Sequence, residues 1–167
     1  MSDLYTELLV KKERTAKDNL LRYGLMVLTV IAAVAGIFIH PVILLAALAF
    51  GIGCYFAFMR TDVEYEYLFV NGDMDVDMVM SKSKRKRVRS FKITEADLVA
   101  PVDSHRMDYY NGSQNMKVYD YSSGNREHKR FAVITRVDNQ NCKIIIEPDE
   151  KLAQAMKNSA PSKVFLD

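Results

Sequence analysis

The sequence predicts a membrane-anchored α+β protein, in which an N-terminal transmembrane helical hairpin precedes a small, mainly-β barrel or sandwich with a C-terminal helix. Two observations carry this prediction. Residues 23–59 contain no Asp, Glu, Lys or Arg, whereas charged residues are frequent elsewhere. From Thr61 onward, apolar side chains recur at every second position, which is typical of strands that cover a core.

We expect residues 1–22 to form a cytoplasmic juxtamembrane helix. Asp3 and Glu7 stand near its start and basic residues gather toward its end, as the helix dipole favours. Between Lys11 and Arg22 there are five basic and two acidic residues. This positive charge suits the anionic surface of a membrane and requires no specific partner.

The uncharged stretch predicts two transmembrane helices. A single helix of 37 residues would be about 55 Å long, whereas the hydrocarbon core of a bilayer is roughly 30 Å thick. The His40-Pro41 turn divides the stretch, because proline lacks the amide hydrogen and disfavours a helical residue before it. The predicted spans are 23–39 and 42–59. A single kinked helix lying in the interface is the alternative.

Basic residues flank this hairpin on one side only. Positively charged residues next to a span stay in the cytoplasm, and the turn between the spans carries no formal charge. We therefore expect a multi-pass protein of the cell membrane, with two spans and both termini in the cytoplasm. The flanking residues are Lys11, Lys12, Arg14, Lys17, Arg22 and Arg60.

Small residues recur at four-residue spacing within the hairpin, which lets helix backbones approach closely. This spacing is compatible with packing inside the hairpin and with a homo-oligomer formed through the small-residue faces. The pairs are Ala32 and Gly36, Ala47 and Gly51, Ala49 and Gly53, and Gly53 and Ala57.

Residues 61–158 are predicted to form a cytoplasmic β domain that begins with a hairpin. Asn71-Gly72 is a strong signal for a two-residue turn, and it places Val70 opposite Asp73. One face of this hairpin is then wholly apolar, as a sheet above a core requires. The other face presents four carboxylates, which call for positive neighbours: Glu64, Glu66, Asp75 and Asp77.

A basic run follows and continues into an expected third strand. Its six cationic residues are the candidate lipid or partner contacts: Lys82, Lys84, Arg85, Lys86, Arg87 and Arg89. One hypothesis is an internal salt-bridged strand, with Arg87 against Asp77 and Arg89 against Asp75. A second is contact with anionic lipid headgroups. Residues 61–167 contain 17 basic and 17 acidic side chains, a balance that disfavours nucleic acid as the partner.

The remaining elements follow from local patterns. Thr94 and Asp97 indicate a short helix that Pro101 ends. A second helix is expected from Pro148 to about Asn158, and residues 159–167 are expected to form a tail. Strands are predicted at Met116–Tyr121, His128–Val137 and Cys142–Glu147.

No enzymatic or metal-binding motif is recognisable. His105 and His128 are isolated in polar segments, and there is no phosphate-binding glycine loop or nucleophile elbow. The acidic face of the first hairpin has oxygen ligands for a divalent cation, but neutralisation by the basic run is the simpler interpretation. We therefore expect a protein that is not an enzyme, with no catalytic, cofactor-binding or metal-binding residues and no cofactor.

The order of the elements resembles that of bacterial pleckstrin-homology-like (PH-like) domains. The whole chain, with its two-span hairpin, the Glu64-Tyr65-Glu66-Tyr67 strand, Asn71-Gly72, the basic run and Glu147-Pro148, resembles an uncharacterised family of bacterial two-span membrane proteins, a domain-of-unknown-function family. The resemblance implies a non-enzymatic, membrane-anchored binding or scaffold module. The alternatives are a small accessory subunit of a membrane transporter or complex, an anionic-lipid-binding module, and an enzyme of unrecognised type.

Overall fold

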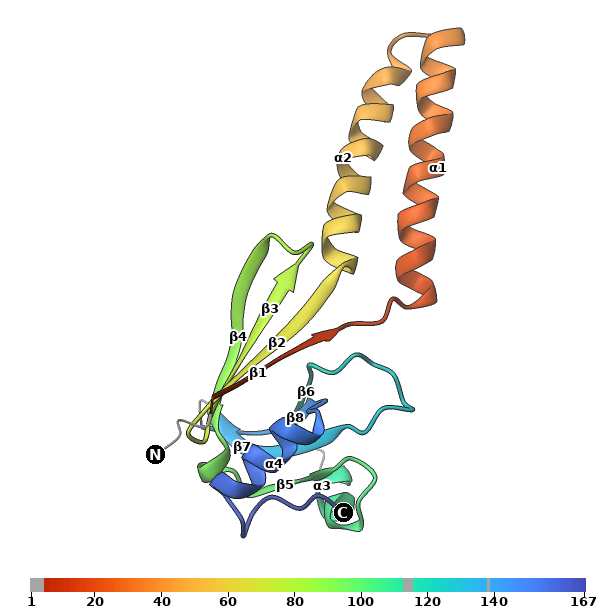
Figure 1. The fold of residues 1–167 in the computed structure, drawn as a ribbon. Coiled ribbons are helices and arrows are strands. Elements are labelled where there is room, and N and C mark those ends of the chain that lie inside the picture. The colour runs from red at the N-terminus through yellow and green to blue at the C-terminus, as the bar shows by residue number, and fades with distance from the viewer. Residues whose placement is uncertain (1–4, 113–115, 138) are drawn as a thin grey trace. The chain divides into compact units, whose positions relative to one another are not determined.

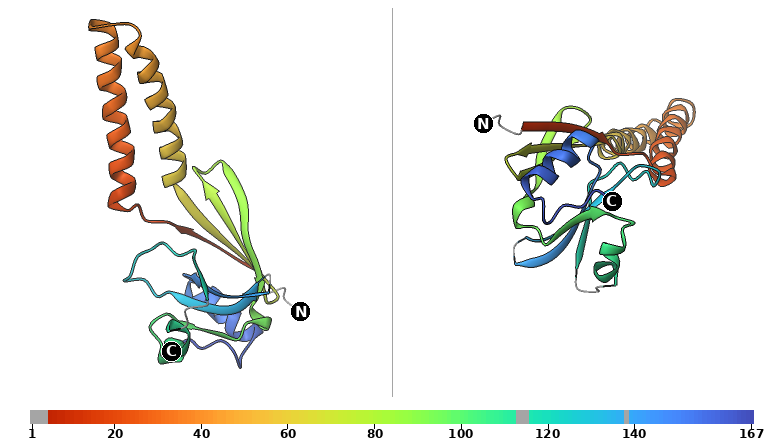
Figure 2. Two further views of the ribbon diagram at one scale, coloured as in Figure 1. Left: turned by 180° about the vertical axis from the view of Figure 1, so that it is seen from behind. Right: turned by 60° about the horizontal axis from the view of Figure 1, so that its bottom comes forward.

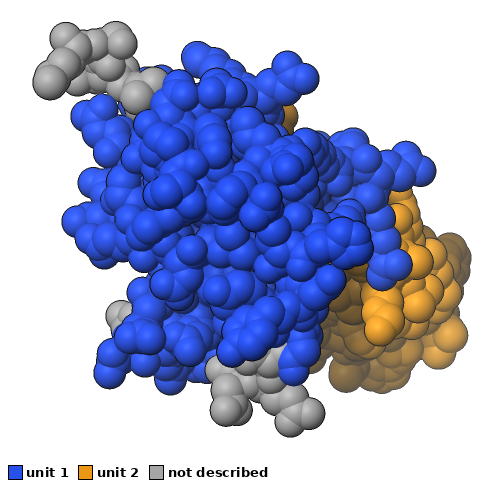
Figure 3. Space-filling model, turned by 90° about the horizontal axis from the view of Figure 1, so that it is seen from below, with its two compact units in different colours: residues 1–13, 64–79, 85–167 blue, residues 14–63, 80–84 orange. Residues whose placement is uncertain are grey.

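A computed structural model describes residues 5–112, 116–137 and 139–167 (Figure 1). The chain forms two compact units, which Figure 3 distinguishes by colour. The helical unit comprises residues 14–63 and 80–84. The β unit comprises residues 1–13, 64–79 and 85–167.

The predicted helix over residues 1–22 is wrong, because strand β1 (Tyr5–Lys11) lies within it; Asp3 lies outside the described residues. Side chains in β1 alternate, with Thr6 and Val10 buried and Leu9 exposed, which is the period of a strand. The helix begins only at Ala16, after a capping box in which Thr15 and Asp18 bond each other's backbone N–H groups.

Two antiparallel helices form the helical unit (Figure 1): α1 (Ala16–Phe38) and α2 (Ile43–Thr61). Neither helix includes His40-Pro41, so the predicted break is confirmed. The Val42 amide donates to His40 Nδ1 at 3.3 Å across this turn. Both helices are long and apolar enough to cross a bilayer.

Small residues pack inside this hairpin at two of the predicted pairs. Ala32, Gly36 and Ala47 are buried between the helices. A Cβ atom on Gly36 would lie 2.6 Å from the Leu44 side chain, so a larger residue fits there only if Leu44 moves. Gly53, in contrast, has no neighbouring atom within 4 Å of its Cβ direction and faces outward.

The β unit contains two four-stranded sheets, and no closed barrel forms within the residues that the structure describes. The first sheet has the order β1, β2 (Val63–Val70), β3 (Asp73–Met80), β4 (Lys84–Lys92). The second has the order β5 (Leu98–Pro101), β7 (Phe131–Val137), β8 (Gln140–Ile146), β6 (Lys117–Asp120).

The Asn71-Gly72 turn is confirmed, since β2 ends at Val70 and β3 begins at Asp73. Both turn residues have positive φ angles, 52° for Asn71 and 99° for Gly72, as a type I′ turn requires. The expected apolar face is buried at its centre: Tyr65, Tyr67, Phe69, Met74 and Val76.

Strand β1 pairs antiparallel with β2, in a register that places Lys11 opposite Glu64 and Tyr5 opposite Val70. The helical hairpin is therefore the connection between two neighbouring strands of one sheet. In the described chain no strand pairs with the other edge of β1.

The short helix predicted from Thr94 to Pro101 is wrong. Only a single 3₁₀ turn, η1 (Ile93–Glu95), forms there, and it is followed by β5. The apolar Leu98-Val99-Ala100 segment gains more from pairing in a sheet than from one helical turn, and Val99 pairs with Val133 of β7. The segment that follows β5 contains two short helices, η2 (His105–Met107) and α3 (Asp108–Asn111).

The C-terminal helix is confirmed as α4 (Glu150–Ser159), capped by Asp149, whose side chain accepts from the Leu152 amide at 2.8 Å. Its buried residues are Leu152, Ala153, Ala155 and Met156. Both views in Figure 2 show α4 beside β1.

The expected tail is part of the fold. Val164 is fully buried and bridges to Val99, whose carbonyl accepts the Phe165 amide at 2.8 Å. Phe165 packs against a buried cluster that includes Ala132 and Ile134 of β7, so the segment covers one side of the second sheet.

Candidate functional site

The structure divides the predicted basic run by residue type, because its arginines have partners inside the β unit. Arg87 binds two carboxylates, with Nη1 at 3.1 Å from Asp75 and Nε at 3.3 Å from Asp77. The Arg87–Asp77 pair was predicted from sequence. The predicted Arg89–Asp75 pair is wrong, because Asp75 pairs with Arg87 instead.

Arg89 instead packs among aromatic residues. Its guanidinium lies 4.1 Å above the Tyr119 ring, and its Nε donates to the Tyr121 hydroxyl at 3.4 Å. A planar guanidinium stacks well on an aromatic face, whereas a lysine ammonium would leave this contact incomplete.

Arg85 neutralises a buried carboxylate. Glu66 is 2% exposed, and its Oε1 accepts from Arg85 Nη2 at 2.8 Å. Its other oxygen, Oε2, lies 2.7 Å from the same Nη2 without a well-aligned hydrogen bond. Burial raises the pKa of Glu66, the hydrogen bond with the Glu7 carboxyl raises it further, and Arg85 opposes both effects.

The lysines of the run are different. Lys82, Lys84 and Lys86 are exposed, and none forms an ion pair with a described residue. The arginines therefore hold the sheet together, while the three lysines keep their charges available to an external anion.

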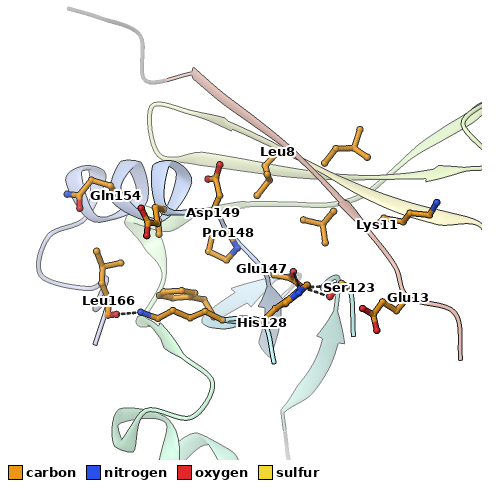
Figure 4. Close-up of a pocket in the computed structure, with 16 residues that line it drawn as sticks. Leu8, Lys11, Glu13, Ser123, His128, Glu147, Pro148, Asp149, Gln154 and Leu166 are labelled. Atoms are coloured by element: carbon orange, nitrogen blue, oxygen red, sulfur yellow. Dashed lines mark hydrogen bonds and ion pairs between the residues drawn. The ribbon is translucent and has the colours of Figure 1, made fainter. Parts of the chain in front are cut away.

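A groove of about 940 Å³ lies elsewhere in the β unit and was not predicted (Figure 4). One wall is β1, which contributes Leu8 and Val10. The opposite wall is the start of α4, including Ala153, and Phe131 adds a further apolar surface. An extended chain fits such a groove, because it has an apolar lining and an unpaired strand edge beside it.

The floor of the groove is a hydrogen-bonded cluster around Glu147 (Figure 4). The Ser123 hydroxyl donates to Glu147 Oε2 at 2.6 Å, and the His128 Nδ1 lies 2.7 Å from Oε1. His128 is therefore not the isolated histidine expected from sequence. Glu147 lies between the serine and the imidazole and bonds both, so it fixes the orientation of these two side chains.

The cluster is anchored in the core by Tyr67. The Tyr67 hydroxyl donates to the Tyr121 carbonyl at 2.6 Å and accepts from the Glu147 amide at 3.2 Å. Burial raises the pKa of Tyr67 far above its ordinary value, so this phenol stays protonated and keeps its donor. The groove floor is thus rigidly connected to the first sheet.

Sequence reasoning missed the groove because its walls come from opposite ends of the chain. The signal that was available is the alternation in Tyr5–Lys11, which marks an extra strand. Among the described residues, no group of three His, Cys, Asp or Glu side chains is arranged to hold a metal ion. His105 pairs with Asp108 on the surface, at 3.3 Å.

Two small sheets, a C-terminal helix and an apolar helical hairpin together define a PH-like α+β protein with two helices capable of spanning a bilayer. The chain belongs to the family described as Bacterial PH-like domain (DUF6106), whose model matches residues 2–166. The family resemblance inferred from sequence is therefore confirmed. Comparison with curated proteins and with solved structures found no significant match.

Proposed function

We propose that this protein is a non-enzymatic, membrane-anchored binding module that holds an extended segment of a partner protein in the groove beside β1. The observation that carries the proposal is the unpaired edge of β1 at an apolar groove. Backbone hydrogen bonds from an added strand would supply affinity, and the apolar lining would select side chains.

Anchoring is supported by the length and surface of the hairpin. The helices have 23 and 19 residues, which corresponds to about 35 and 29 Å at 1.5 Å per residue, close to the thickness of a hydrocarbon core. Large apolar side chains such as Phe38, Leu45 and Leu48 are more than 60% exposed. Lipid is the solvent in which this surface is stable.

The pairing of β1 with β2 supports a topology with both ends of the hairpin on one side. Two strands that share hydrogen bonds must occupy the same compartment, and one precedes α1 while the other follows α2. The basic flanks predict that this compartment is the cytoplasm.

Thiol labelling tests the anchor and its topology. Single cysteines at His40 and Ser162, with Cys54 and Cys142 replaced, would be exposed to a membrane-impermeant reagent on intact cells. We expect labelling at position 40 alone. Labelling at position 162 would contradict the topology, and extraction of the protein by alkaline carbonate would contradict the anchor.

Peptide selection tests the groove. The full chain in lipid nanodiscs would be used to select peptides from a random library, and affinity would be measured by fluorescence polarisation. Ala153→Trp should fill the groove and weaken binding at least about tenfold, or about 1.4 kcal/mol. The control Val118→Trp adds the same bulk at an exposed site in β6. Equal affinity for the two variants would contradict the proposal.

A further inference from the structure

The turn between β3 and β4 belongs to the helical unit, although both strands belong mainly to the β unit. The Ser81 amide donates to the Asp62 carbonyl, just beyond the end of α2, at 2.8 Å. A hydrogen bond from the Ser83 amide to the Met80 carbonyl, at 3.1 Å, closes the turn. The turn is therefore fixed at one end of the hairpin.

This end of the hairpin is strongly basic. Asp62 also accepts a hydrogen bond from Arg14, at 3.0 Å, so the segment that precedes α1 contacts the same place. The helical unit has six basic and two acidic side chains, a net charge of four positive. The basic residues are Arg14, Lys17, Arg22, Arg60, Lys82 and Lys84.

Four of these cations are available to a ligand. Arg14 is paired with Asp62, and Arg22 is buried with its guanidinium 3.9 Å above the Phe58 ring. The other four are exposed and form no ion pair with any residue in the described ranges: Lys17, Arg60, Lys82 and Lys84. Cations gathered at one end of the hairpin repel each other, and an anion among them reduces that repulsion.

We propose that Lys82 and Lys84, together with Lys17 and Arg60, bind the phosphate headgroup of an anionic lipid at the basic end of the hairpin; this rests on the membrane anchoring proposed above. The helices fix the depth of the site, because one apolar span separates the basic end from the uncharged His40-Pro41 turn. Basic residues at that depth lie at the headgroups of the leaflet.

Lysine suits this role better than arginine would. Its ammonium is a point charge on a flexible stem, which follows a mobile headgroup without fixed bidentate geometry. The chain places lysines at the turn and arginines where carboxylates and aromatic rings require a planar group. The site is also distinct from the peptide groove, since none of its four residues lines that groove.

The test uses the full chain reconstituted in vesicles of phosphatidylcholine and phosphatidylglycerol. Spin-labelled lipids of each type report, by electron paramagnetic resonance, the ratio of association constants at the protein surface. We expect the wild-type chain to prefer phosphatidylglycerol, and 1 M NaCl to reduce that preference, because screening shortens the Debye length to about 3 Å.

The decisive variant is Lys82→Gln with Lys84→Gln. Because each basic side chain near an anionic surface contributes about fivefold, we expect the loss of two lysines to lower the ratio by at least about twofold and up to roughly 25-fold. The matched control is Lys117→Gln with Lys151→Gln, which removes two exposed lysines from the β unit and should leave the ratio unchanged.

Three outcomes would overturn the inference. These are no preference for phosphatidylglycerol in the wild type, an unchanged ratio in the Lys82 and Lys84 variant, or an equal decrease in both variants. A chain that does not insert into the vesicles would overturn the anchoring proposal as well. Unchanged melting curves for both variants would show that the lost preference does not come from unfolding.

Discussion

The helical unit and the β unit place the same kinds of apolar side chain in opposite environments. Among the described residues, 20 of the 25 exposed large apolar side chains lie between Leu20 and Phe56. The β unit instead buries its largest apolar residues, Tyr67 and Phe69 among them, completely. The exposed apolar surface of the helical unit is the surface that the proposed membrane anchoring would place in lipid, whereas the β unit has the buried core of a domain surrounded by water.

The largest expected effect is at the centre of the β unit. Tyr67→Asp would bury a charge in the core and remove both hydrogen bonds of the hydroxyl, so we expect a loss of more than about 4 kcal/mol of stability. The control is Tyr109→Asp, at a residue that is 83% exposed. Near-ultraviolet circular dichroism of the full chain in detergent should show the β unit unfolding in Tyr67→Asp alone, with helical signal retained. Equal tolerance at the two positions would contradict the assignment of the core.

A smaller effect is expected inside the hairpin. Gly36→Leu places atoms where the Leu44 side chain lies, and we expect a cost of about 1 to 3 kcal/mol. Gly53→Leu is the control, because nothing lies within 4 Å of its added Cβ. Thermal unfolding followed at 222 nm would separate the two variants. If Gly53→Leu instead changes the oligomeric state in analytical ultracentrifugation, the outward face holds copies of the chain together.

The salt-bridged strand should contribute less. Arg87→Glu places a carboxylate beside Asp75 and Asp77, and we expect a loss of roughly 1 to 2 kcal/mol, because Arg87 is largely exposed. The control is Lys86→Glu, which changes the charge by the same amount at the preceding residue but removes no ion pair seen among the described residues. Chemical denaturation of both variants gives the comparison, and adding Asp77→Arg should restore part of the Arg87→Glu loss. Equal losses at 86 and 87 would mean that the overall charge of the strand matters and the pairing does not.

The smallest effect concerns pH. A carboxyl whose pKa is raised by folding, as at Glu66, adds stability while it is protonated and loses that contribution as pH rises through its folded-state pKa. Glu7, whose pKa is lowered mainly by its hydrogen bond with Tyr5, contributes in the opposite direction and loses its contribution as pH falls. The stability of Glu66→Gln relative to the wild type should therefore increase as pH rises above about 4.5, the ordinary pKa of a glutamate carboxyl. If the stabilities of the two proteins change with pH in the same way, Glu66 does not contribute to the pH dependence.

Local signals in the sequence predicted part of this fold well. His40-Pro41 and Asn71-Gly72 each determine a turn through their own backbone preferences, and both turns are where they were expected. The C-terminal helix was predicted from Pro148 onward and begins at Glu150. Such features depend on neighbouring residues alone, which is why a single sequence is sufficient for them.

Features that depend on distant partners were missed. Strand β1 lies in a segment with acidic residues at its start and basic residues at its end, a pattern that favours a helix. Its partner, β2, follows in the sequence only after both helices. Strand β6 pairs parallel with β8, which no turn signal encodes. The groove needs β1 and α4 together, so it could not be predicted while residues 1–22 were expected to be helical.

The insertion of the hairpin between β1 and β2 determines when the first sheet can form during synthesis. Strand β1 leaves the ribosome before the helices, but its partner is synthesised only after residues 12–62, so the first sheet is completed after both helices have emerged. Non-local pairing of this kind slows folding, and a lone strand is prone to aggregation in the meantime. A fragment that starts at Thr61 would lack β1 permanently and expose the bare edge of β2. A soluble form of the β unit should instead join Lys11 to Glu64 through a short turn, which their pairing in the sheet already allows.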